Sequence, residues 1–163
     1  MTGTARGISS EGFRDQTPWP WEQVYRMVEA TELVELEDRW LLPYRGMRVT
    51  QVQVSHQLTL LLDGEAQVDL ETEAVLSEDS PRASDAVTSR LVPERQEVAP
   101  ALALFGATVL SAVAFKSGAL QLVFDSGMHL DVQPDPRYEA WSVHGPASVH
   151  LVCQPGGGVA MWR

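Results

Sequence analysis

The chain has 163 residues, of which 44% are apolar and 21% charged, and its formal net charge is −10. This length and composition fit one globular domain and argue against wholesale disorder. No stretch approaches the roughly 18 uninterrupted apolar residues of a membrane-spanning helix, and residues 1–16 lack the apolar core of a secretory signal. With a single cysteine, Cys153, the sequence predicts a cytoplasmic protein.

Acidic residues outnumber basic ones by 22 to 12. Such a chain repels phosphate backbones and anionic lipid, so neither nucleic acid nor a membrane is an expected partner. The excess is concentrated between Asp63 and Asp85, where eight acidic residues accompany one basic residue, Arg82. A localised acidic surface would attract a basic protein. The alternative is that these residues only keep the protein soluble.

Residues 1–16 are small and polar without periodicity, and we expect a flexible arm before a single domain at 17–163. Thr17 can cap a helix. The spacing of an amphipathic helix follows at Trp21, Val24, Tyr25 and Val28. The segment 31–40 alternates imperfectly and is predicted as a strand.

From Gly46 onward, apolar and polar residues alternate as they do in strands. Asp63-Gly64 is a hairpin turn signal. We expect a surface connection at 77–92 and a helix at 94–105. The expected strands are 49–54, 58–62, 68–75, 109–115, 119–124, 128–133, 138–143, 149–154 and 159–162.

Two of these strand blocks resemble one another. Gly46-Met-Arg-Val49 matches Gly106-Ala-Thr-Val109, and Leu58-Thr-Leu-Leu-Leu-Asp63 matches Leu120-Gln-Leu-Val-Phe-Asp125. Alternating strands always look somewhat alike, but agreement at the glycines and aspartates favours an internal repeat of 46–71 and 106–133. The predicted fold is therefore α+β, an antiparallel sheet or half-barrel of two duplicated three-stranded meanders with one or two helices packed on it.

No motif identifies an enzyme, a metal or a cofactor. His129 and Asp131 share one face of an expected strand, a spacing that a metal site could use, but no H-x-x-x-H or paired-cysteine signature accompanies them. Cys153 lies in an apolar strand, where a buried inert thiol is expected. The glycines of 155–158 lead into a strand and not into the helix of a phosphate-binding loop. We expect no catalytic, cofactor or metal residues.

Two binding hypotheses remain open. In the first, an acidic and aromatic surface engages a basic protein. Its candidate residues are Asp63, Glu65, Asp69, Glu71, Glu73, Trp19 and Trp21. In the alternative, a small ligand binds in a pocket between the two meanders, lined by His129, Tyr138 and Trp141. Asp135, Arg137 and Glu139 would place a charged rim around Tyr138, or simply pair on the strand surface.

The segment Arg137-Tyr-Glu-Ala-Trp141, followed by Gly145-Pro146, Pro155-Gly-Gly-Gly158 and Trp162, resembles a family of small acidic uncharacterised bacterial proteins. That family carries a similar opening, Leu42-Pro43-Tyr44-Arg45-Gly46-Met47, so the resemblance spans 42–162 and implies no chemistry. In size, charge and style of fold the chain also resembles immunity proteins, which block a toxin by binding it. The expected function is a non-enzymatic protein-binding module, and exposed sheet edges would permit a homodimer.

Overall fold

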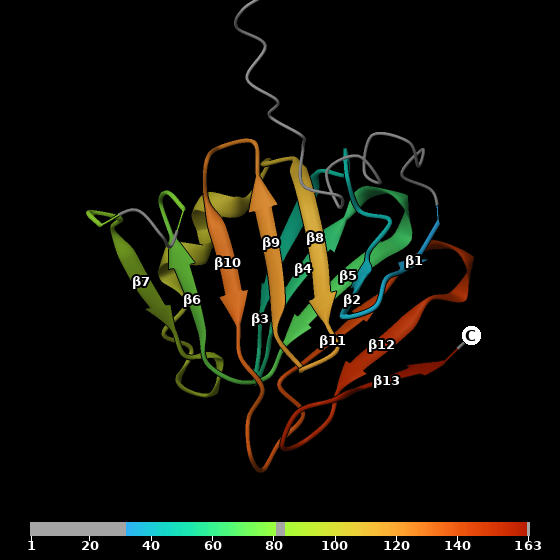
Figure 1. Cartoon of the computed structure of the whole chain (residues 1–163). Helices are drawn as coiled ribbons and strands as arrows, with labels where there is room; N and C mark the ends of the chain where they lie inside the picture. The colour runs from blue at the N-terminus through green and yellow to red at the C-terminus, as the bar shows by residue number, and fades with distance from the viewer. Residues whose placement is uncertain (1–31, 81–83, 163) are drawn as a thin grey trace, which may run out of the picture.

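The computed structural model describes residues 32–80 and 84–162, which form two antiparallel β-sheets packed face to face (Figure 1). The strands are β1 (Val34–Glu35), β2 (Arg39–Leu41), β3 (Val49–Val54), β4 (Leu58–Leu62), β5 (Ala66–Leu70), β6 (Ala74–Ser77), β7 (Thr88–Leu91), β8 (Val109–Phe115), β9 (Leu120–Phe124), β10 (His129–Val132), β11 (Trp141–His144), β12 (His150–Cys153) and β13 (Val159–Trp162). Short 3-10 helices are η1 (Asp63–Glu65), η2 (Pro93–Arg95), η3 (Ala99–Leu104) and η4 (Pro146–Ser148). One sheet has the order β1-β2-β8-β9-β10-β6-β7 and the other β13-β12-β11-β5-β4-β3.

The core lies between the two sheets. Apolar side chains alternate with polar ones along the strands, and this alternation decides which face of each sheet is buried. In β4, Leu58, Leu60 and Leu62 are buried, and in β9 Leu120 and Phe124 are buried in the same way. Residues of both sheets belong to one continuous apolar cluster. The outer faces of the sheets are therefore left to carry the polar side chains.

The meanders β3-β4-β5 and β8-β9-β10 begin at a shared junction. Arg48 and Thr108 form an isolated antiparallel bridge. The backbone NH of Arg48 donates to Asp63 Oδ1 (2.8 Å), and that of Thr108 donates to Asp125 Oδ1 (2.9 Å). A register shift follows the first residue of both β3 and β8. The two aspartates that stand out in the sequence comparison thus have the same backbone-capping role in the two meanders.

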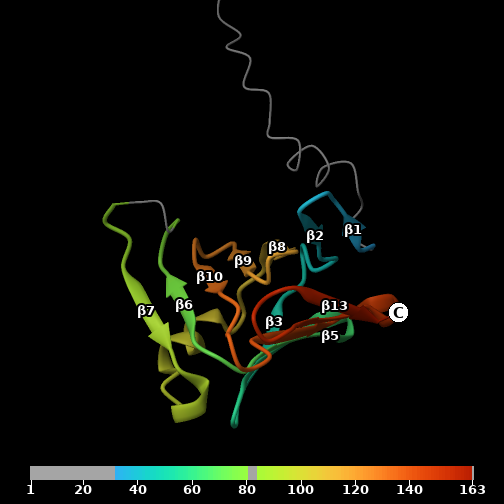
Figure 2. The same ribbon diagram turned by 60° about the horizontal axis from the view of Figure 1, so that its bottom comes forward.

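After its meander, each half of the chain crosses to the opposite sheet. β6, which follows β5, pairs with β10, whereas β11, which follows β10, pairs with β5. The two crossing links, 71–73 and 133–140, meet at one end of the sandwich, where β5 and β10 end and β6 and β11 begin (Figure 2). There the backbone NH groups of Glu71 and Thr72 both donate to the carbonyl of Ala140 (3.0 and 3.3 Å). Each sheet consequently contains strands from both halves.

A further junction holds the sheets together at the β8–β9 turn. Trp141 Nε1 donates to the carbonyl of Gly118 (2.8 Å), and the Cys153 thiol donates to the same oxygen (3.3 Å). Gly118 has φ +105°, and a Cβ there would come within 3.0 Å of Pro134 and 3.1 Å of Gly157. A side chain at this position would therefore be strained and would push the two sheets apart.

The prediction of an α+β fold with packed helices is wrong: the described residues form two sheets, not one sheet or a half-barrel carrying helices. The longest helical segment in this part of the chain is the six-residue η3, and η2 and η3 replace the helix expected at 94–105. Pro93 and Pro100 lie in the first turns of these segments and cannot donate backbone hydrogen bonds. The helix expected after Thr17 lies outside the described residues. Among them, no helix is both long enough and apolar enough to cross a membrane.

Most strand predictions are confirmed, with differences that have local causes. The expected strand 68–75 is divided between β5 and β6, because residues 71–73 cross the sandwich. The strand expected from Tyr138 begins at Trp141, since Asp135 Oδ1 accepts the backbone NH groups of Arg137 and Tyr138 and closes a turn there. The segment 31–40 contains β1 and the start of β2, and the expected connection 77–92 contains β7.

Replacement of Trp141 tests the junction at Gly118. We expect Trp141→Phe to lower the free energy of unfolding by about 1–3 kcal/mol, because the Gly118 carbonyl loses its stronger buried donor. Urea denaturation measures the change. The control is Trp162→Phe, whose side chain is 52% exposed and for which about 0.5 kcal/mol or less is expected. Equal losses in the two variants would contradict the assigned role of the indole NH.

Candidate functional site

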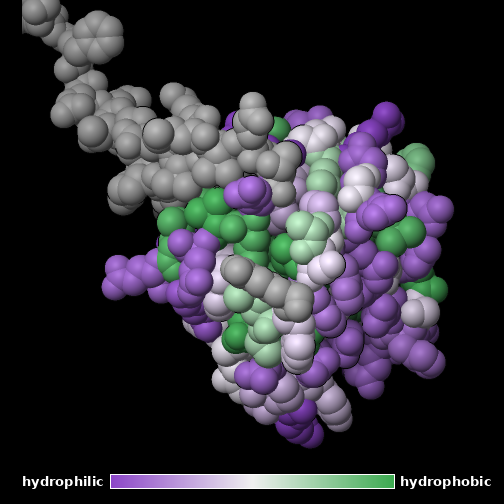
Figure 3. Space-filling model, turned by 90° about the vertical axis from the view of Figure 1, so that its right-hand side faces the viewer, coloured by the Kyte–Doolittle hydropathy of each residue, from purple (hydrophilic) through white to green (hydrophobic). Residues whose placement is uncertain are grey.

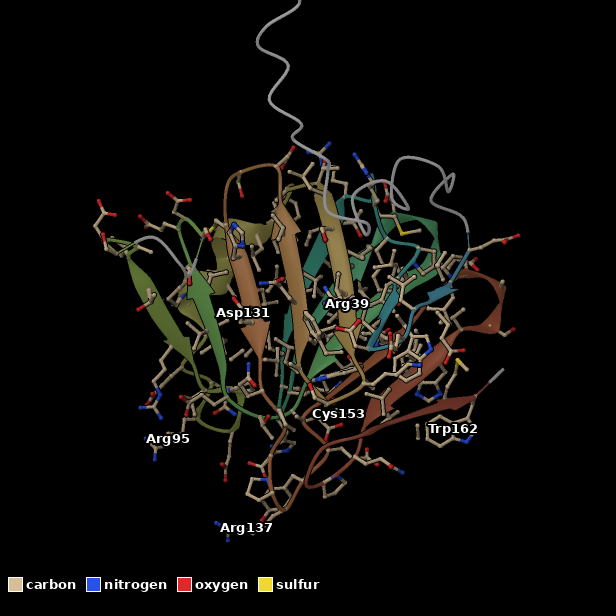
Figure 4. The ribbon with its side chains drawn as sticks, viewed as in Figure 1. Arg39, Arg95, Asp131, Arg137, Cys153 and Trp162 are labelled. Carbon is tan, nitrogen blue, oxygen red and sulfur yellow. The ribbon has the colours of Figure 1, made fainter. Side chains whose placement is uncertain are left out.

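A pocket of about 680 Å³ opens to solvent at the end of the sandwich where the two links cross. Its walls come from the β3–β4 turn (His56 and Gln57), the β5–β6 link (71–73), β7 together with η2 (90 and 92–95), and the β10–β11 link (135–138). Arg95, at the lower left of Figure 4, and Arg137, near its bottom, both line this pocket. The pocket is thus assembled from both halves of the chain, and we name it the crossover pocket.

Charged side chains of both signs line the crossover pocket, four carboxylates and three guanidinium groups. Part of this charge is already used within the protein. Arg90 forms a two-point ion pair with Glu73, and Asp135 caps the turn described above. The remaining charged groups are Glu71, Glu94, Arg95 and Arg137, none of which forms an ion pair with another described residue.

Glu71 is a lining carboxylate whose surroundings raise its proton affinity. Partial burial raises the pKa of Glu71, and the negative charges of Glu139 and Asp69 raise it further. Tyr138, by contrast, stands at the rim with 64% of its surface exposed. A cationic group that entered the pocket would relieve the repulsion at Glu71, and the ring of Tyr138 lines the same pocket.

Next to the pocket, the outer face of the six-stranded sheet carries a hydrogen-bonded network around Asp69. The Asp69 carboxylate is buried and accepts hydrogen bonds from Thr59 Oγ1 (2.6 Å), Gln57 Nε2 (3.0 Å), Gln67 Nε2 (2.8 and 2.9 Å) and Ser142 Oγ (3.3 Å). Gln57 also lines the crossover pocket. Both carboxylate oxygens accept hydrogen bonds, and the donors lie on β4, β5 and β11 as well as in the β3–β4 turn. Asp69 therefore links these three strands and is not available to a partner from solvent.

A row of rings extends from this network toward the sheet edge. His144 Nε2 is 3.8 Å from Asp69 Oδ2, the rings of His144 and His150 stack at 4.1 Å, and Trp162 packs against His150 at 5.1 Å. Figure 3 views the side on which β1 and β13 lie, and its right-hand part, toward this outer face, is mainly polar. Burial and the neighbouring His144 lower the pKa of His150 below its ordinary value of 6.5, against the smaller opposing effects of Glu139 and Asp69.

The structure does not gather the acidic candidates on one surface. Asp63 and Glu65 lie in η1 at one end of β5, whereas Glu71 and Glu73 line the pocket beyond its other end. Asp69, between them, is buried in its own network. The aromatic candidates Trp19 and Trp21 lie outside the described residues.

Nor are the three residues of the alternative pocket brought together. Tyr138 lines the crossover pocket. Trp141 is fully buried between the sheets, and His129 lies on the outer face of the seven-stranded sheet, opposite Ser77. The charged rim expected around Tyr138 is present in part, since Asp135 and Arg137 also line the pocket.

Sequence reasoning missed the contribution of the segment 90–95. The sequence pattern predicts a connection and the start of a helix here, which gives no reason to expect Arg90, Glu94 and Arg95 in a pocket. The signal that could have identified them is the adjacent pair of opposite charges directly after Pro93, the residue that begins η2 shortly after the end of β7.

The described residues contain no group of three or more His, Cys, Asp or Glu side chains arranged to hold a metal ion. Burial raises the pKa of the Cys153 thiol, which donates to Gly118 and lies in the core. The charged lining of the crossover pocket can recognise charge by ion pairing and hydrogen bonding.

The network predicts a large effect of one isosteric substitution. We expect Asp69→Asn to lower the free energy of unfolding by about 2–4 kcal/mol, because an amide group would face donors that now share a carboxylate. The matched control is Asp131→Asn, where Gln121 is the donor seen among the described residues, and the loss should be clearly smaller. Both are measured by urea denaturation in buffer containing EDTA. A larger loss for Asp131→Asn would refute this account.

The lowered pKa of His150 predicts how stability depends on pH. The folded pKa lies below that of the unfolded chain, so the unfolded state binds more protons between the two values. The stability of the parent protein relative to His150→Gln should therefore decrease as the pH falls from about 7 to 5, and stay constant above that range. Chemical denaturation at several pH values measures the difference, and parallel curves for the two proteins would contradict it.

Comparison with known proteins identifies a family for most of the chain. The model of the "Family of unknown function (DUF6188)" matches residues 40–163, and the chain belongs to this family. The match includes every residue of the crossover pocket and of the Asp69 network. No curated protein and no solved structure matches the chain.

Proposed function

We propose that this DUF6188 member is a protein-binding module without enzymatic activity, which takes a charged, mainly basic segment of a partner protein into the crossover pocket. The observation that carries the proposal is the set of four charged lining side chains that have no ion-pair partner in the described structure, Glu71, Glu94, Arg95 and Arg137. They offer charges of both signs within one open cavity of about 680 Å³.

Within the pocket, the carboxylates and the guanidinium groups would have different roles. Glu71 lies where neighbouring negative charge accumulates, so a lysine or arginine of the partner would be favoured there. Arg95 and Arg137 can each hold a carboxylate at two points. The exposed ring of Tyr138, which lines the same pocket, supplies the kind of aromatic contact that is enriched at binding hot spots.

The polar lining favours a polypeptide segment over a small organic ligand. Pockets for small molecules are mostly apolar with a few polar groups, whereas seven of the lining side chains here carry charge. The formal charge of −10 adds a long-range attraction for a basic partner. An immunity-type inhibitor, which blocks a basic toxin by binding it, is the specific form of this proposal that the size and charge of the chain support.

A small charged metabolite is the second candidate, because the volume of the pocket lies within the usual range of roughly 300–1,000 Å³ for small-molecule sites. Two measurements together distinguish the two candidates. Association with a basic protein should weaken steeply as ionic strength rises. A metabolite held in the pocket should instead raise the melting temperature of the isolated protein.

A charge-matched pair of double variants tests the proposed site. Glu71→Gln/Glu94→Gln removes two carboxylates from the pocket, and Glu65→Gln/Glu78→Gln removes two exposed carboxylates that do not line it. In affinity capture from native lysate at low salt, we expect a basic protein that binds the parent and the control but binds the pocket variant about tenfold more weakly. Asp69 is left intact because its replacement would disturb the network.

Equal capture by all three proteins, or equal loss in both double variants, would place the interaction outside the pocket. If nothing is captured and a charged metabolite raises the melting temperature of the parent but not of Glu71→Gln/Glu94→Gln, the second candidate replaces the first.

A further inference from the structure

Three buried polar atoms belong to neighbouring residues on the outer face of the seven-stranded sheet, away from the crossover pocket. They are Ser77 Oγ, His129 Nδ1 and Asp131 Oδ2, and none has a hydrogen-bond partner among the described residues. Ser77 is fully buried and lies directly opposite His129 in the β6–β10 pair. Asp131 follows His129 by two residues on β10, so its side chain is on the same face. Buried polar atoms without partners are costly and rare.

The surroundings of Asp69 show what is missing at Asp131. Asp131 has the same place in the meander β8-β9-β10 that Asp69 has in β3-β4-β5. Four side chains donate to Asp69, whereas Gln121 Nε2 is the donor seen for Asp131, at 3.1 Å from Oδ1. Ser142 faces Asp69 from the neighbouring strand, but the corresponding neighbour of Asp131 is the apolar Val75. Asp131 Oδ2 is therefore left without a hydrogen-bond donor among the described residues.

We propose that Asp131 Oδ2, His129 Nδ1 and Ser77 Oγ bind a divalent first-row transition-metal ion, with Zn²⁺ as the probe. Ser77 on β6 pairs with His129 on β10, and Asp131 follows two residues later on the same face, so the three side chains are neighbours on adjacent strands. This site is independent of the crossover pocket, because none of its residues lines that pocket.

The donor atoms suit such an ion better than the alternatives. An imidazole nitrogen and a carboxylate oxygen are ligands typical of zinc and its neighbours, with the Ser77 hydroxyl as a weaker third donor, whereas Ca²⁺ and Mg²⁺ take oxygen ligands. The atoms are shielded from solvent, which excludes a bulky organic cation and admits only a small species. A water molecule could also bridge them, but it would bring no positive charge to the carboxylate. Three protein ligands leave a fourth position open for water or for a donor from a partner.

The test is metal titration of the full chain after treatment with EDTA. Isothermal titration with Zn²⁺ should show one bound ion per chain, and Asp131→Asn and His129→Gln should each weaken the affinity by about tenfold or more. The control is His144→Gln/His150→Gln, which removes the stacked histidines of the opposite sheet and should leave the affinity unchanged. Co²⁺ provides a second readout, since its visible absorption in the parent should report an N/O site that Asp131→Asn abolishes.

Circular dichroism establishes that each variant is folded, and Asp131→Asn conserves the shape of the side chain. Absence of Zn²⁺ binding to the parent would overturn the proposal and would leave a bridging water as the partner of the three atoms. Binding that survives Asp131→Asn but is lost in His144→Gln/His150→Gln would also overturn it, because the ion would then belong to the stacked histidines.

Discussion

The whole sandwich depends on the exchange of strands between the two halves of the chain. β5 is completed by β11 from the second half, and β10 by β6 from the first. A three-stranded meander has one apolar face to bury and two unpaired edges, so neither half could satisfy its backbone or its core alone. The junctions at Arg48–Thr108 and at Gly118 then set how the two sheets lie on each other.

The same exchange creates the candidate binding site. Both links cross the sandwich at the same end, which brings their polar residues beside the β3–β4 turn and η2. Residues of the two links, this turn and η2 together line the crossover pocket. The exchange also gives the two sheets corresponding outer faces with an aspartate at the centre of each. Around Asp69 the neighbouring strands supply a full set of donors. Around Asp131 they do not, and the two faces have thereby become chemically different.

Local patterns in the sequence predict the strands well, because alternation reports burial directly: β3, β4, β8 and β13 have the expected bounds. They fail where a long-range requirement overrides them. Glu71–Glu73 look like part of a strand but must cross between sheets, and 94–105 has helical spacing but contains Pro100. The acidic candidates are close in the sequence, yet β5 separates Asp63 from Glu71 and buries Asp69. Only the pairing of distant strands shows that Arg95 and Arg137 border the same pocket.

The strand exchange also has a kinetic consequence. Leu70 pairs with Trp141 and Ala74 with Val132, so the contacts that complete both sheets close loops of about sixty to seventy residues. Such high contact order places a chain among the slow folders, in the range of roughly milliseconds to seconds. Until those loops close, each meander exposes an edge that fits the other half of any copy of the chain. Refolding at high protein concentration therefore favours intertwined dimers in which the halves are traded between molecules, and dilution favours the monomer.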